Sequence, residues 1–300
     1  MDRIPAMVCG WPRVSVPPAC RDVEVVIGID EAGRGPVLGS LVYVAAFWPL
    51  SEHEEICKLG FDDSKQLKEE RREELFHRIR SHGSIGWVIE EVSAKMLSKN
   101  MLRSNPVSLN ALSFQAVIRA LETIRDAENG PKVGGIFIDT VGDAEFYKST
   151  LTRALGQDFG RFTIEKKADA TYRVVSAASI IAKVTRDTLM KEFLWEEPYL
   201  NLNRDYGSGY PGDENCVRWL SAAQQEVFGY PSIVRFSWST TREALDKNGA
   251  CNVLWECDED QSLGGADIKN YFAVGAKKPV KRSDFFTRRK MRRLDDSFLR

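Results

Sequence analysis

Residues 23–36, with the sequence VEVVIGIDEAGRGP, determine the fold predicted for this chain. The first part is a β-branched run typical of a buried strand, and it ends on two acidic residues, Asp30 and Glu31. Gly33 and Gly35 then predict a tight loop, because glycine adopts backbone conformations that other residues avoid. We therefore expect a strand that opens directly into a loop bearing polar chemistry.

Further strand and helix patterns surround this segment. Four more strands are predicted at 38–48, 84–92, 134–139 and 162–166. Apolar residues at helical spacing predict helices at 67–80, 109–125, 144–155 and 174–195. Three strands linked in antiparallel fashion come first, and helices and strands then alternate. This order predicts an α/β fold with a mixed five-stranded sheet flanked by helices.

The two ends of the chain differ from its centre. Residues 1–22 carry an acid at position 2 and several prolines but no sustained apolar run, which predicts an irregular, untargeted N-terminal arm. Residues 23–238 contain every predicted strand and form the expected principal domain. Residues 239–300 are predicted to be a helical extension ending in the basic run 277–293.

The composition limits the classes of function. The formal charge of -1 at pH 7 gives no global attraction to a polyanion, so any nucleic-acid contact must use local clusters. The chain has only 3 His, and its 6 Cys show no CxxC spacing, which disfavours zinc sites and Ser-His-Asp catalysis. No apolar stretch reaches the ~20 residues of a bilayer-spanning helix, so no membrane association is expected.

Acidic residues follow three of the predicted strands: Asp30 with Glu31, then Asp139, then Asp169. The carboxyl ends of neighbouring strands form a crevice in such sheets, so these acids can meet. Clustered carboxylates bind divalent cations, and oxygen ligands favour Mg²⁺ or Mn²⁺ over zinc. Two such ions catalyse phosphodiester hydrolysis. A turn or helix cap is the better interpretation of any one acid alone, but the convergence of three strand ends favours metal.

Six motifs in order along the chain resemble the type 2 ribonuclease H family. They are IDEAGRGPVLG at 29–39, DSK at 63–65, FIDT at 137–140, KADA at 167–170, VSAASI at 175–180 and DYGSGYP at 205–211. The similarity extends from about Val23 to Trp238, and its later stretches resemble the catalytic A subunit of the eukaryotic heterotrimeric members. Ser40 and Arg173 depart from it, because the family commonly has proline there.

The resemblance implies an RNase H-like catalytic domain at 23–238, with site residues assigned by position. The implied catalytic and metal-binding carboxylates are Asp30, Glu31, Asp139 and Asp169. The implied contacts to the ribose 2′-hydroxyl are Gly33, Arg34, Gly35 and Tyr210, and Lys65 is expected to approach the substrate backbone. Lys167, Lys183 and Arg186 are candidates for phosphate contacts, with solvated surface charge as the alternative.

The implied activity is endonucleolytic, with two ions of Mg²⁺ or Mn²⁺ activating the attacking water. It would cleave the RNA strand of RNA/DNA hybrids and incise 5′ of single ribonucleotides in duplex DNA, leaving 3′-hydroxyl and 5′-phosphate ends. Two alternatives are a relative that cleaves hybrids only and a non-catalytic nucleic-acid-binding scaffold subunit that has retained the fold.

The resemblance also implies two accessory subunits and a nuclear location, with the cytoplasm as a second compartment. In the tail, Ile268, Tyr271 and Phe272 have the spacing of a sliding-clamp binding box without its leading glutamine. Packing of this segment on a partner subunit is the favoured interpretation. The basic run 277–293 is expected to serve nuclear import or nucleic-acid contact.

Overall fold

The computed structural model describes residues 7–61, 67–140, 142–197, 202–225, 228–247 and 249. Lys65, the motif with Ile268, Tyr271 and Phe272, and the basic run 277–293 lie outside the described residues. The chain divides into two compact units, one of residues 1–223 and 230–242 and the other of residues 224–229 and 243–300. The whole sheet lies in the first unit.

A mixed sheet forms the centre of this unit, as predicted. Its strand order is β3-β6-β5-β4-β7-β8. The bounds are β3 Val14–Ser15, β4 Glu24–Ala32, β5 Leu41–Pro49, β6 Gly86–Val92, β7 Lys132–Asp139 and β8 Arg161–Glu165. β4, β5, β6 and β3 pair antiparallel, whereas β4, β7 and β8 pair parallel. The predicted number of five strands is wrong, because β3 adds a sixth.

The sixth strand comes from the arm that we expected to be irregular. Residues 7–12 form a small hairpin, β1 Met7–Val8 with β2 Trp11–Pro12, and β3 then pairs with β6. Arg13 forms an ion pair of 2.5 Å with Glu91 of β6. The second oxygen of Glu91 accepts a hydrogen bond of 2.8 Å from Ser40. Ser40, which departs from the family pattern, thus links the arm and β6 to the loop after β4.

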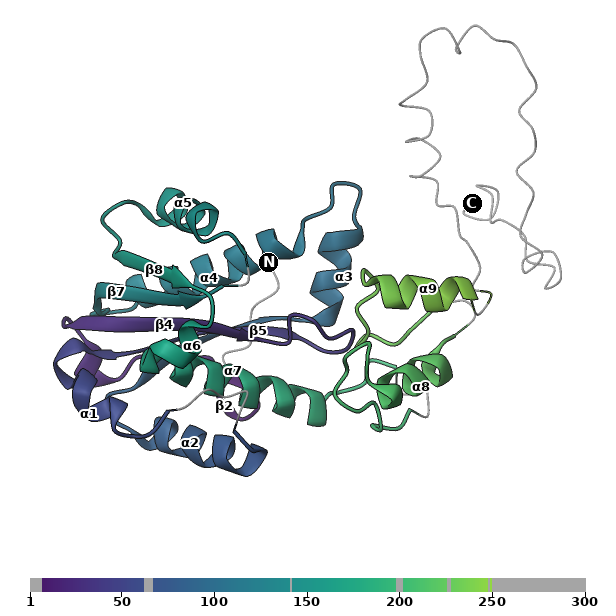
Figure 1. Ribbon diagram of the computed structural model, residues 1–300, viewed down its shortest axis with the longest axis horizontal. Helices are drawn as coiled ribbons and strands as arrows, with labels where there is room; N and C mark the ends of the chain where they lie inside the picture. Colours follow the sequence, from purple (N-terminus) through teal and green to yellow (C-terminus); the bar gives the residue numbers. More distant parts are fainter. Residues whose placement is uncertain are drawn as a thin grey trace, which may run out of the picture. The chain divides into compact units, whose positions relative to one another are not determined.

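Helices cover both faces of the sheet. The helices of the described residues are α1 His53–Cys57, α2 Glu69–Ser81, α3 Ala94–Leu102, α4 Leu109–Arg125, α5 Ala144–Leu155, α6 Ala168–Thr171, α7 Arg173–Lys191, α8 Glu214–Ala223 and α9 Ser239–Lys247, with 3₁₀ turns at Pro18–Cys20 and Leu50–Glu52. Figure 1 shows α4 and α5 on one face and α1, α2 and α7 on the other. None of the described helices is long and apolar enough to span a bilayer.

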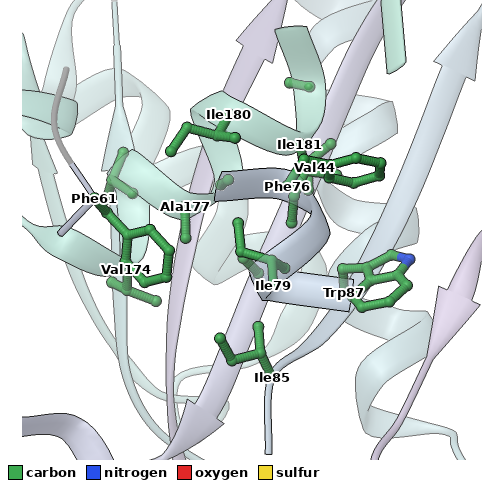
Figure 2. Close-up of a cluster of buried hydrophobic side chains, with 14 of the residues drawn as sticks. Val44, Phe61, Phe76, Ile79, Ile85, Trp87, Val174, Ala177, Ile180 and Ile181 are labelled. Carbon is green, nitrogen blue, oxygen red and sulfur yellow. The ribbon is translucent and has the colours of Figure 1, made fainter. Parts of the chain in front are cut away.

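Two apolar clusters attach the helices on the two faces to the sheet. On the α7 face, Val44 and Trp87 pack with Phe76 of α2 and Ile181 of α7 (Figure 2). On the other face, the cluster includes side chains of α4 and α5. A Cβ at Gly28 would lie 2.3 Å from the backbone of Val174, so only glycine lets α7 approach β4 this closely. The middle of β4 is therefore held against α7.

Candidate metal centre and substrate loops

Three of the predicted carboxylates meet at the carboxyl-terminal ends of the parallel strands. Asp30 lies near the end of β4, Asp139 ends β7 and Asp169 lies in α6. One carboxylate oxygen from each lies within 4.8 Å of the others. The parallel pairing of β4 with β7 aligns Ile29 with Ile138. The next residues, Asp30 and Asp139, therefore lie side by side at the same end of the sheet. The structure therefore contains the convergence that the strand ends predict.

A tight turn between β8 and α6, which we call the corner, places Asp169 beside the other two carboxylates. Lys167 adopts the left-handed conformation with φ 61 and caps α6. The amide of Ala168 donates to Asp139 Oδ1 at 3.2 Å, and Ser176 of α7 donates to the carbonyl of Asp169 at 2.6 Å. Arg173, the second departure from the family, begins α7 and donates to the carbonyl of Phe61. The corner is thus tied to both β7 and α7.

The carboxylates are placed at an electrostatic cost. Asp30 and Asp169 are only 2% and 1% exposed. Burial, followed by the negative charges of Glu31 and Asp139, raises the pKa of Asp30 well above its usual value, against the hydrogen bonds from Ser179 and the Glu31 amide. Within the described part of the chain, Asp30 Oδ2 is buried without a hydrogen-bond partner. An unsatisfied oxygen among repelling acids with oxygen-only donors fits a hard divalent cation such as Mg²⁺ or Mn²⁺.

Glu31, the fourth predicted ligand, lies outside this group of three. Successive residues of a strand face opposite sides of the sheet. Asp30 contacts Ser179 of α7, whereas Glu31 pairs in register with Tyr43, which belongs to the cluster on the α4 face. Glu31 lines a pocket there together with Asp139. Glu31 therefore approaches the three carboxylates from the face of the sheet that α4 covers.

The loop that follows β4 requires glycine. Gly33 has φ 86, and a Cβ there would lie 2.6 Å from the Ser40 carbonyl and 2.7 Å from Arg186 Cδ. A Cβ at Gly35 would lie 3.1 Å from the ring of Tyr210, which is 47% exposed. The residues predicted to contact a ribose are thus neighbours. We call residues 33–39 and 206–213 the substrate loops.

A buried arginine that sequence analysis did not single out holds the first substrate loop. Arg235 is 0% exposed, and it donates to the carbonyls of Gly39 (2.7 Å), Gly33 (2.6 Å) and Arg34 (3.2 Å). Burial, with the charge of Arg186 second, lowers the pKa of Arg235 to about 9. Because peptides are planar and trans, carbonyls aimed at Arg235 turn the amides of Arg34 and Gly35 away from it. Nothing local in the sequence signals a contact across some 200 residues.

Asp213 holds the second substrate loop. Its carboxylate accepts hydrogen bonds from the Ser208 amide (2.8 Å), the Ser208 hydroxyl (2.7 Å) and the Asn215 amide (2.9 Å). These bonds lower the pKa of Asp213 to about 2. Its amide donates to the carbonyl of Tyr210 at 3.0 Å. Sequence analysis missed this residue, although an aspartate directly before a helix is a common cap signal.

The predicted basic residues have different environments. Lys183 pairs with Asp187 at 2.6 Å, and Arg186, which is 4% exposed, donates to the Ser208 carbonyl at 3.2 Å. Both line a pocket of about 460 Å³ that Tyr210 also lines. Lys167 is exposed and is not among the residues lining that pocket. The guanidinium of Arg34 donates to Asn110 and Ser113, which anchors the loop to α4.

Comparisons with known proteins identify the family of this chain. The family model for Ribonuclease HII matches residues 27–241. The A subunit of ribonuclease H2 from Arabidopsis thaliana is 42% identical over 239 residues, which cover 80% of this chain and 79% of that protein.

Solved structures of the same class are also similar. The ribonuclease H2 from Pyrococcus horikoshii OT3 has a TM-score of 0.62 at 33% identity and covers 74% of this chain and 98% of its own. A chain from the PCNA:RNase HII complex of Archaeoglobus fulgidus has a TM-score of 0.57 at 30% identity, covering 72% and 95%. The residues matched by the family model include the three carboxylates and both substrate loops, and the chain belongs to the ribonuclease HII family.

Proposed function

We propose that this chain is a metal-dependent endoribonuclease that cleaves the RNA strand of RNA/DNA hybrids and incises 5′ of single ribonucleotides in duplex DNA. The products carry 3′-hydroxyl and 5′-phosphate ends. One observation carries the proposal: a buried cluster of Asp30, Asp139 and Asp169 lies in the same unit as a glycine loop packed on an exposed tyrosine, Tyr210. Membership of the ribonuclease HII family supports it.

The carboxylates supply the metal-binding function. Asp30, Asp139 and Asp169 would hold two ions, with Glu31 contributing from the α4 face. When bound, Mg²⁺ or Mn²⁺ activates a water molecule and stabilises the leaving oxygen of the phosphodiester. The hydroxyl of Ser176 holds the backbone of Asp169, and the amide of Ala168 holds the carboxylate of Asp139.

The substrate loops supply discrimination between ribose and deoxyribose. A 2′-hydroxyl both donates and accepts hydrogen bonds, and it is the one group that separates the two sugars. The amides turned outward by Arg235 offer donors, and the exposed ring of Tyr210 offers a hydroxyl and a surface for the next sugar. Gly33 and Gly35 leave room for this approach.

Local positive charge compensates for a chain of net charge -1. Lys183 and Arg186 share their pocket with Arg72, Lys191 and Arg204, against Glu69 and Asp187. This excess of cations beside Tyr210 suits the phosphates that flank a bound ribose, and such contacts release counterions. Lys65 and Lys167 belong to the proposal as further backbone contacts.

The relatives also suggest partners. We propose that the chain assembles with two accessory subunits in the nucleus, as its similarity to the A subunit of ribonuclease H2 suggests. The Archaeoglobus fulgidus protein was solved in a complex with PCNA, which favours testing a weak clamp contact through Ile268, Tyr271 and Phe272. Loss of partner binding on Tyr271→Ala with clamp binding unchanged would support packing on a partner subunit, the interpretation that we favour.

The proposal is tested with the full chain, with and without accessory subunits, on a duplex containing one ribonucleotide. We expect incision 5′ of the ribonucleotide in Mg²⁺, none in EDTA, and none with Asp139→Asn, which should still fold and bind substrate. Full activity of Asp139→Asn would refute the metal assignment. Binding without cleavage by the wild-type assembly would favour the scaffold alternative, and cleavage of hybrids alone would favour the hybrid-only alternative.

A further inference from the structure

A side chain of the N-terminal arm is connected to the first substrate loop through two other residues. Arg13 is 8% exposed and directly precedes β3, at the edge of the sheet. Its guanidinium forms the 2.5 Å ion pair with Oε2 of Glu91. Oε1 of the same carboxylate accepts the 2.8 Å hydrogen bond from the hydroxyl of Ser40, the residue that follows the loop. We call Arg13, Glu91 and Ser40 the Glu91 bridge.

The backbone around Arg13 is fixed to β6. The carbonyl of Arg13 accepts a hydrogen bond from the Ile89 amide at 2.8 Å, and the carbonyl of Pro12 accepts one from the Trp87 indole at 3.0 Å. Glu91 lies two residues beyond Ile89 on the same strand, so both side chains face the same side of the sheet. The ion pair therefore joins two segments of backbone that are already held together.

Arg13 holds the carboxylate of Glu91, whose side chain is 17% exposed. A mostly buried carboxylate that loses its ion-pair partner is destabilising, and it turns toward water to lower that cost. Lys95 lines a small pocket with Glu91 and Ser40, but it pairs with Glu196 at 2.7 Å. Without Arg13, the oxygen that accepts the hydrogen bond from Ser40 would therefore no longer be held in place.

Ser40 connects the Glu91 bridge to the backbone of the first substrate loop. The carbonyl of Ser40 faces Gly33 so closely that a Cβ at Gly33 would lie 2.6 Å from it. The preceding carbonyl, of Gly39, accepts a hydrogen bond from Arg235 at 2.7 Å, and Arg235 also donates to the Gly33 carbonyl at 2.6 Å. Arg235 thus fixes the backbone at both ends of the loop, and the Glu91 bridge fixes the side chain of Ser40 beside it.

We propose that Arg13 is a positioning residue for the first substrate loop, on which it acts through Glu91 and Ser40. This inference rests on the proposed function, in which the amides of that loop recognise the ribose. Arg13 helps to hold the loop in the conformation that Arg235 also stabilises. The N-terminal arm then contributes to the selection of ribose, in addition to completing the sheet.

The test measures incision at a single ribonucleotide and cleavage of a long hybrid by the full chain with its accessory subunits. Arg13→Met keeps the apolar part of the side chain. We expect it to lower the rate of incision relative to that of hybrid cleavage about fivefold. Ser40→Ala should lower this ratio by a similar factor. Because both residues act through Glu91, the double variant should lose no more than the larger single effect. Effects that multiply in the double variant would overturn the inference.

The matched control is Arg119→Met, which removes an ion pair of 2.9 Å between α4 and Glu90. Glu90 is the neighbour of Glu91 in β6 and pairs in register with Tyr43, which belongs to the cluster on the α4 face. This variant should lower the Tm and leave the ratio of the two rates unchanged. If Arg13→Met also lowers the Tm without changing the ratio, the arm supports only the fold and the inference is overturned.

A second measurement does not depend on cleavage. Hydrogen exchange of the amides of Arg34 and Gly35, in the same assembly without substrate, reports how often the loop opens. Arg13→Met and Ser40→Ala should each accelerate this exchange about fivefold, and Arg119→Met should not. Unchanged exchange in Arg13→Met would overturn the inference. A wild-type assembly that does not incise at the ribonucleotide would instead overturn the proposed function, and the exchange rates would still decide whether Arg13 positions the loop.

Discussion

The carboxylate cluster and the substrate loops lie at the same end of β4 but concentrate opposite charges. At the cluster, Asp30, Asp139 and Asp169 bring negative charge together in a buried site. Beneath the loops, Arg235 and Arg186 are buried near each other, and Arg235 makes its hydrogen bonds to uncharged backbone carbonyls. Each region thus has a charge that a bound phosphate with its metal ions would balance.

The two regions also differ in what holds them. Strand pairing and a short corner place the carboxylates, with every contributing residue on or beside a regular element. The loops depend on hydrogen bonds across long sequence separations, such as the one from Arg235 to Gly33. Removing a carboxylate should therefore abolish cleavage and leave the fold intact. Removing a residue that holds a loop, such as Arg235, should lower both cleavage and stability.

The largest effect is expected for Asp30→Asn. It should lower cleavage on the order of a thousandfold, about 4 kcal/mol of transition-state stabilisation. In EDTA it should raise the free energy of unfolding by about 1–3 kcal/mol, because a buried charge repelled by Glu31 and Asp139 is removed. Single-turnover kinetics and thermal unfolding in EDTA measure the two quantities. A lower Tm in EDTA would contradict the claim that the cluster is electrostatically costly.

The same contrast explains what the amino-acid sequence could predict. Asp30, Asp139 and Asp169 each end or follow a recognisable strand, so their convergence follows from topology. Strand β3 has two residues in a proline-containing arm, and periodicity has no meaning over so short a length. Arg235 and Asp213 act through three-dimensional contacts, and their burial and bonding depend on the finished fold.

The next largest effect is expected for Arg235→Met, which keeps an apolar side chain of similar length. The buried carbonyls of Gly33 and Gly39 would lose their hydrogen-bond donor, which destabilises the fold. Part of this loss is offset, because the variant no longer buries the charged guanidinium of Arg235. We expect the free energy of unfolding to fall by about 2–4 kcal/mol. Incision at single ribonucleotides should fall more than cleavage of long hybrids. Equal losses on both substrates would show that Arg235 supports the fold without orienting the loop.

A smaller and more selective effect is expected for Asp213→Ala. The loop of Tyr210 would lose three hydrogen bonds. The rate of incision at single ribonucleotides (junction incision), divided by the rate of cleavage of long hybrids, should therefore fall about five- to tenfold. The matched variant Tyr210→Ala should lower the same ratio, because it removes the group that Asp213 positions. An unchanged ratio in Asp213→Ala would show that the loop is held by other contacts.

The pKa of Asp213 predicts how this support responds to acid. A carboxyl whose pKa is lowered on folding to about 2 contributes stability above its unfolded value of about 4, and this is lost as the pH falls through about 2. The anchor therefore stays ionised between pH 8 and 5. We expect the ratio of junction incision to hybrid cleavage to be constant across this interval, although both rates change with the metal centre. A ratio that falls toward pH 5 would contradict the lowered pKa.

The smallest effect is expected for Arg173→Pro at the corner that carries Asp169. Arg173 is the first residue of α7, where proline presets the helical φ. Tyr172 already has φ -110 and ψ 115, an extended conformation close to the one favoured before proline. The lost bond to the Phe61 carbonyl opposes this gain, so the free energy of unfolding should change by less than about 1 kcal/mol. Cleavage should change less than about twofold, because strand pairing and the Ser176 bond hold the carboxylates independently. A large loss of cleavage with normal unfolding would mean that the entry to α7 positions Asp169, and that the cluster depends on its supports as strongly as the loops do.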